Sequence, residues 1–137
     1  MQSTQLRVSI GRITFFILVS IFTLSVTLQF LFAGMAIFLH AANWMKHTMF
    51  VHLFGFTLPV LLLIFAFISN LPRWAYWQIF GLFTGIFLMY FTANIRGILP
   101  WIGVLHPIIG LLLFLLSIFM LTQSWKFIFK QRNEVLK

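Results

Sequence analysis

Four histidines are the residues of this chain that could do chemistry, since only one acidic residue accompanies them. His52 and His106 lie inside apolar runs, "FVHLFGF" and "VLHPIIG". A polar side chain is costly in such a run, and within a membrane it often has a function. A neutral imidazole can ligate a metal or hydrogen-bond to another helix. The two histidines are therefore candidate ligands of a metal or cofactor.

The composition indicates that lipid surrounds the chain. Of its 137 residues, 62% are hydrophobic and 7% are charged, whereas a soluble domain carries about 25% charged residues. The formal net charge is +8. We expect the basic residues to lie at helix ends, where they set topology and meet anionic lipid. Nothing in the sequence resembles a nucleic-acid-binding module.

A single acid, Glu134, and the absence of cysteine narrow the chemistry further. Paired-carboxylate catalysis, a Ser-His-Asp triad and a carboxylate proton relay each need an acidic residue inside the site. Disulfides and thiolate metal sites need cysteine. The sequence therefore predicts no catalytic residue and no enzyme acting on its own. Acid–base chemistry would require a partner, a cofactor or a bound substrate.

Helices of about 20 mostly apolar residues are long enough to cross a bilayer. Such segments fill most of the chain, so we predict one domain, residues 1–137, with an all-α fold. The fold class is a four-transmembrane-helix bundle with short loops. The predicted helices cover about residues 13–39, 49–68, 74–95 and 101–125, and a basic tail follows at 126–137.

The basic residues predict the orientation of this bundle. Four spans put both termini on one side, and most of the lysines and arginines lie on that side. The positive-inside rule then places both termini in the cytoplasm, with the bacterial cytoplasmic membrane as the expected location. Two basic residues and all the histidines fall on the outer side, namely Lys46, Arg96, His40, His47, His52 and His106.

The predicted helix starts place His52 and His106 at the same depth. They follow the starts of the second and fourth helices, which run in parallel, by about four and five residues. At about 1.5 Å per residue, both rings lie roughly 6–8 Å below those starts. The first hypothesis is therefore a haem b with bis-histidine ligation, which predicts a cytochrome-like electron-transfer protein.

The haem hypothesis gives roles to four neighbouring residues. Gly55 and Gly110 lie one turn deeper than the two histidines and would leave room for a flat group. Lys46 and Arg96 lie on the same side of the membrane, where they would meet the haem propionates.

Three alternatives remain open at this point. His40, His52 and His106 come from three helices and could form a metal site. A quinone or another lipid-soluble ligand could bind near the outer interface, with a histidine, Tyr90, Asn94 and Arg96 as hydrogen-bonding groups. The histidines could also be structural, holding together an accessory or assembly subunit of a membrane complex. Its partner would be another membrane subunit or a second copy of the chain.

Two further polar residues receive minor roles. His47 falls in the first predicted loop, where we expect an interfacial side chain. Pro59 leaves the carbonyl of Gly55 without its helical donor, and Gln29 in the first helix could supply one. We expect Gln29 to lie deeper than the layer of histidines.

Short motifs give the chain a resemblance to a family of small four-helix bacterial membrane proteins with no assigned function. The motifs are "AG" at Ala33 and Gly34, an H…G pair at His52 and Gly55, and "LHP" at residues 105–107. The resemblance implies a single membrane domain and no known activity. The chain is also distantly similar to membrane b-type cytochromes, which implies only that His52 and His106 could be axial ligands.

Overall fold

A computed structural model describes residues 2–135, with side chains from residue 5 to residue 128, and this part of the chain is helical without strands. Seven elements follow one another along the chain. They are α1 (Gln2–Phe38), the 3-10 helix η1 (Ala41–Asn43), α2 (Trp44–Phe54), α3 (Thr57–Ile68), α4 (Arg73–Ile95), α5 (Pro100–Gly103) and α6 (His106–Val135).

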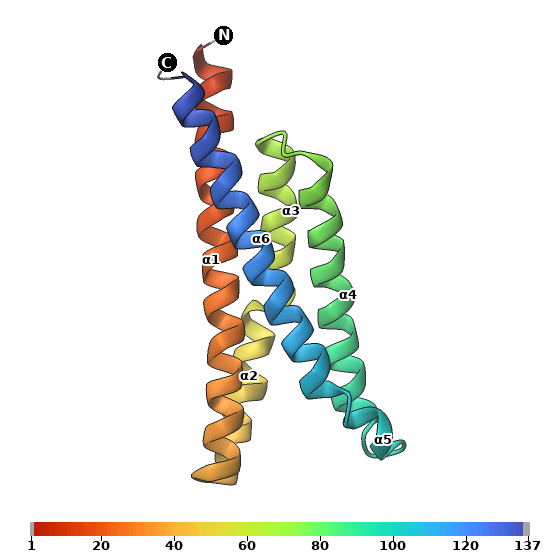
Figure 1. Cartoon of the computed structure of the whole chain (residues 1–137). Coiled ribbons are helices and arrows are strands. Elements are labelled where there is room, and N and C mark those ends of the chain that lie inside the picture. The colour runs from red at the N-terminus through yellow and green to blue at the C-terminus, as the bar shows by residue number, and fades with distance from the viewer. Residues whose placement is uncertain (1, 136–137) are drawn as a thin grey trace.

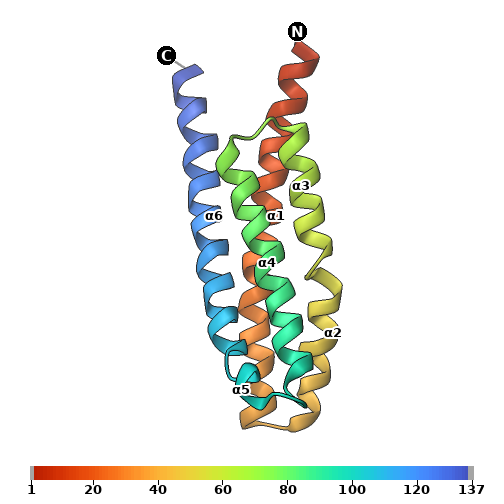
Figure 2. The same ribbon diagram turned by 90° about the vertical axis from the view of Figure 1, so that its right-hand side faces the viewer.

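The elements form four helical segments that are long and apolar enough to cross a membrane, which confirms the predicted fold class. The α2–α3 segment and α6 both pack on α1 and α4. In Figure 1, α6 leans from α4 at one end of the bundle toward α1 at the other. Both chain ends lie at the same end of the bundle, and the opposite end holds α2 and α5 (Figures 1 and 2). We call these the terminal end and the histidine end.

Prolines explain why two of the four segments are divided. Pro59 has no backbone N–H to donate to the carbonyl of Gly55, and the second segment breaks between α2 and α3 at Gly55–Phe56. Pro107 likewise cannot donate to the carbonyl of Gly103, and the fourth segment breaks between α5 and α6 at Val104–Leu105. Each break lies four residues or fewer before its proline.

The core consists of apolar side chains that the helices bury between them. Its fully buried large members are Phe15, Phe22, Leu62, Ile79, Leu82 and Met120. Two glycines allow α4 and α6 to approach closely, because a Cβ at Gly81 or Gly85 would lie 2.9 Å from the tip of a leucine on α6. Small residues commonly serve this purpose between membrane helices.

The observed helix bounds differ from the sequence prediction at the chain ends and around the first connection. The first helix was expected from about residue 13, but α1 already starts at Gln2. The third segment was expected at residues 74–95 and runs from Arg73 to Ile95. The second was expected to start near residue 49, but α2 starts at Trp44. The short η1 completes the turn after α1, so the chain re-enters a helix five residues early. The predicted tail continues α6 up to Val135, and the side chains from residue 129 onward lie outside the described residues.

Candidate functional site

The histidine end holds a layer of polar groups between the helices, and His47 on α2 is the first of them. Its Nδ1 lies 3.1 Å from the backbone oxygen of Gln29 on α1. A second hydrogen bond joins the same two residues, because the side-chain Nε2 of Gln29 donates to the backbone oxygen of His47 at 3.1 Å. These reciprocal bonds join α1 to α2 and hold the imidazole of His47 in a half-buried position.

His106, the first residue of α6, is held in the same way by α4. Its Nδ1 lies 3.1 Å from the backbone oxygen of Met89 and 3.1 Å from the hydroxyl oxygen of Thr92. The hydroxyl of Thr92 donates to the backbone oxygens of Leu88 and Met89, so toward His106 it can only accept. Both partners of His106 Nδ1 are therefore acceptors, and the ring is half-buried.

The hydrogen bonds determine which nitrogen carries the proton in each neutral ring. A carbonyl oxygen only accepts, so Nδ1 of His47 and Nδ1 of His106 must both be protonated. The lone pair of each neutral imidazole then resides on Nε2. Among the described residues, neither Nε2 has a hydrogen-bond partner. A ring anchored through Nδ1–H with a free Nε2 is the usual arrangement of a metal-ligating histidine.

The two anchored rings lie opposite each other across the bundle. Their centroids are 6.4 Å apart and their planes are inclined by 58°. His47 comes from the second membrane segment and His106 from the fourth, and both segments pack on α1 and α4. The pair therefore bridges two helices that reach it from opposite sides. We call His47 and His106 the histidine pair.

His52 is not part of this pair, which corrects the expectation that it would face His106. Its Nδ1 is bonded to the hydroxyl of Tyr90 at 3.0 Å, and its side chain is exposed on the outer surface of the bundle. The cause is the spacing of His47 and His52 on α2, since side chains five residues apart point about 140° apart around a helix, and the face with His47 is the one bonded to α1. His47 lies three residues after Trp44, near the end of the bundle, whereas His52 lies about a turn and a half further along the helix.

The three-histidine alternative is not supported by the positions of its residues. Within the described part of the chain, no three His, Cys, Asp or Glu side chains gather closely enough to hold a metal ion. His40 is exposed and caps η1, where its Nδ1 accepts a hydrogen bond from the backbone N–H of Ala42 at 3.1 Å. A role in the local turn accounts for its position.

Gly55 and Gly110 do not border an open slot. A Cβ at Gly55 would lie 2.7 Å from the backbone oxygen of Val51 and 3.5 Å from the hydroxyl of Tyr90. A Cβ at Gly110 would lie 3.3 Å from the terminal methyl of Met89. Protein atoms thus occupy the space that the sequence analysis reserved for a flat group. Lys46 and Arg96 are exposed at the histidine end, as the sequence analysis expected.

Sequence reasoning missed His47, Thr92 and the backbone oxygen of Met89, and it misplaced Gln29. The glutamine lies in the histidine layer rather than below it. It also retains a buried side-chain oxygen, Oε1, without a hydrogen-bond partner. One sequence signal could have found His47, namely the short stretch between the first two apolar segments. A tight turn in so short a stretch lets the second helix start early enough to include His47.

A shallow pocket of about 370 Å³ lies on the exposed face of α4 at the same end. Aromatic rings and one amide form its wall, and Tyr90 connects it to His52. Of the groups that the quinone hypothesis named, Tyr90 and Asn94 line this shallow pocket, whereas Arg96 and the histidines do not. Its lining consists of Phe87, Tyr90, Phe91, Asn94 and Ile95.

Fold and site together define a four-helix membrane protein with a pair of inward-facing histidines at one end. Residues 29–95 match the model of a family described as a family of unknown function, DUF6220. This stretch, just under half of the chain, contains the "AG" and H…G motifs but ends before "LHP". The match confirms the resemblance to a family without assigned function. No curated protein and no solved structure matches the chain.

Proposed function

We propose that the protein is a small cytochrome-like membrane protein that binds one haem b between His47 and His106. The observation that carries the proposal is the matched anchoring of these rings, which gives each a protonated Nδ1 and a free Nε2. Haem iron is commonly held by axial histidine. The proposal keeps the cofactor expected from the sequence and replaces His52 by His47 as a ligand.

The separation of the rings supports ligation on opposite sides of one metal. Metal–imidazole bonds of about 2.0–2.1 Å would put the two Nε2 atoms roughly 4 Å apart, and the ring centres roughly 6 Å apart. The observed centroids are 6.4 Å apart. The spacing of the two rings is therefore compatible with His47 and His106 both holding the iron of one haem, which would supply the one-electron chemistry.

The space beside the pair is filled by a side chain that can move. What stands at Gly110 is the methyl end of Met89 rather than backbone. Methionine is unbranched and adapts its rotamer easily. Gly110 and Met89 would then border the haem plane, whereas Gly55 is closed off by the backbone of Val51. Lys46 and Arg96 remain the proposed partners of the propionates.

In this function the chain's own residues bind and orient, while the haem supplies one-electron chemistry. The backbone oxygens of Gln29 and Met89 hold the imidazole tautomers and increase the basicity of Nε2. Phe30 and Phe114 pack edge-to-face nearby, and Phe30 also lies close to Gly110. A quinone near Tyr90 and Asn94, or another membrane subunit, would exchange electrons with the site.

Visible spectra of the protein purified in mild detergent from haem-replete cells test the proposal. We expect a Soret band that is lost in His47→Ala and in His106→Ala and retained in His52→Ala and His40→Ala. The last two variants are matched controls at the same end. A colourless wild-type protein would refute haem binding, and a band lost in His52→Ala but kept in His47→Ala would refute the revised ligand pair.

A second candidate function is that of a non-catalytic accessory or assembly subunit with structural histidines. The observation in its favour is that every hydrogen bond of His47, His52 and His106 to a side chain or a distant backbone atom joins two membrane segments. Co-purification of a partner subunit with colourless protein would support it. Retention of that partner after His47→Ala and His106→Ala would show that the histidines act inside the bundle.

We also propose the orientation in which both termini face the cytoplasm of a bacterial cell. The described basic residues at the terminal end outnumber those at the histidine end, which by the positive-inside rule favours the cytoplasm for the terminal end. They are Arg7, Arg12, Arg73 and Lys126, against Lys46 and Arg96. A reporter enzyme that works only in the cytoplasm should be active when it is fused after residue 137. Activity of a reporter that works only outside the cytoplasm, fused at the same position, would overturn this orientation.

A further inference from the structure

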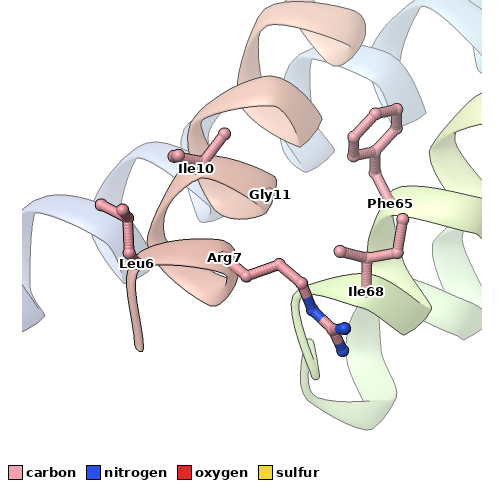
Figure 3. A pocket seen from close by; sticks show the side chains of 6 residues that line it. All are labelled: Leu6, Arg7, Ile10, Gly11, Phe65 and Ile68. Carbon is pink, nitrogen blue, oxygen red and sulfur yellow. The ribbon is translucent and has the colours of Figure 1, made fainter. Parts of the chain in front are cut away.

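A groove between α1 and α3 opens on the outer surface at the terminal end. Figure 3 shows its walls, which are formed by one face of α1 and by Phe65 and Ile68 on α3. Its volume is about 320 Å³, roughly ten times the share of one water molecule in the liquid. Apart from one arginine its lining is apolar, and consists of Leu6, Ile10, Gly11, Phe65 and Ile68.

The groove has a closed floor because the two helices touch beneath it. A Cβ at Gly11 would collide with the hydroxyl of Ser69, and Ser69 is completely buried. The absence of a side chain at Gly11 therefore brings α1 against the end of α3. The remaining opening faces the lipid, so a flexible hydrocarbon chain can enter it from the side.

Arg7 supplies a positive charge at the mouth of the groove. Its side chain extends from α1 past Ile68 to the turn that follows α3, with the guanidinium at the level of the helix end (Figure 3). Residues 5–128, whose side chains are described, contain no Asp or Glu. Arg7 therefore has no carboxylate partner among these residues, and an anion from outside the chain can use its hydrogen-bond donors.

We propose that this groove binds one anionic phospholipid, with an acyl chain in the groove and the phosphate of the headgroup on Arg7. Apolar walls and a single cation at the interface match the two parts of such a lipid. Guanidinium groups bind phosphate through two parallel N–H···O bonds. The site lies at the terminal end and is independent of the histidine pair, so it does not rest on the proposed haem.

Native mass spectrometry of the purified chain tests the site. The protein is incubated with equal amounts of phosphatidylglycerol and phosphatidylcholine that carry the same acyl chains. We expect one retained lipid per chain, with phosphatidylglycerol in excess. Arg7→Gln should reduce that preference about tenfold, the usual effect of losing one hydrogen bond between charged groups. Lys126→Gln, at the same end but outside the groove, should leave the preference unchanged.

A second variant tests the hydrocarbon part of the site. Ile10→Trp should fill the groove from the exposed face of α1 and reduce retention of both lipids, whatever their headgroups. Equal retention of the two lipids by the wild-type protein would overturn the proposal. So would equal loss of preference in Arg7→Gln and Lys126→Gln, because the charge of the whole end would then account for it. Unchanged retention in Ile10→Trp would exclude the groove.

Discussion

The two ends of the bundle present different polar groups. At the histidine end, His47, His106 and Gln29 are turned inward and bonded to neighbouring helices. At the terminal end, Arg7 and Arg73 are exposed, and the described side chains offer them no acid. Inward polar groups hold helices together or hold a cofactor between them, whereas outward cations are available to lipid. A hydrogen bond from Gln78 to Gln123 also joins α4 to α6 toward the terminal end, so the histidine end is distinguished by its two half-buried imidazoles.

The largest effect on stability should come from the helix contact at the terminal end. Gly11→Ala places a methyl group against the buried hydroxyl of Ser69, and overpacking of this kind costs about 1–3 kcal/mol. The matched control is Gly34→Ala on the same helix, where nothing lies within 4 Å of the added atom. Thermal unfolding in detergent should show a clearly lower midpoint for Gly11→Ala only. Equal midpoints would mean that α1 and α3 do not meet at Gly11.

The next effect should appear at the histidine end. His106→Ala removes the bonds to Met89 and Thr92, and cross-helix hydrogen bonds in membranes contribute about 0.6–1.7 kcal/mol. His40→Ala removes only an exposed bond within a turn. Unfolding of cofactor-free protein should therefore show a lower midpoint for His106→Ala than for His40→Ala. If the two variants unfold alike, the anchoring bonds of His106 contribute nothing to stability.

A smaller effect on stability is expected for Gln29, because its side chain forms one hydrogen bond but also buries one unpaired oxygen. Its Nε2 donates to the backbone of His47, but its Oε1 is buried without a partner. Gln29→Leu removes the bond and the unpaired oxygen together, so the net loss should stay below about 1 kcal/mol. The same unfolding assay measures it, with His106→Ala as the reference. A loss greater than that of His106→Ala would mean that Oε1 finds a partner, for instance a water molecule.

The smallest effect on stability should follow removal of an exposed charge at the terminal end. Arg73→Gln is expected to change the free energy of unfolding by less than about 0.5 kcal/mol, as surface substitutions usually do. The midpoints of wild-type and variant protein in neutral detergent should coincide. A large shift would show that Arg73 has an intramolecular role, and the distinction between the two ends would then fail.

The sequence was sufficient for the four-helix fold, and the two prolines that account for the helix breaks are visible in it. Hydrophobic segments of membrane length and Pro59 and Pro107 are local signals, and they act in the same way in every context. The identity of the histidine pair is not local. It depends on where α2 starts, and each residue of shift rotates a side chain by about 100° around the helix. Because α2 starts at Trp44 and not near residue 49, His47 belongs to the helix. The packing of α2 on α1 then turns its side chain inward.

The hydrogen-bond partners of the histidine pair could not be predicted from the sequence either, for a different reason. Gln29 and His47 are eighteen positions apart, and two of the acceptors are backbone oxygens, which every residue carries. Nothing in the residue types of Gln29 or Met89 identifies their carbonyls as anchors. Only the packing of α1 on α2 and of α4 on α6 selects them. His52, by contrast, looked equally suitable in the sequence but faces outward with Tyr90.

The division of the second membrane segment has a consequence for the proposed site. His47 is carried by α2, which has 11 residues and is separated from α3 by the break at Gly55–Phe56. The core around Leu62 and Ala66 belongs to α3. In the proposed function, a molecule bound between His47 and His106 would contact the second membrane segment through α2, and the core on α3 would lie outside its site.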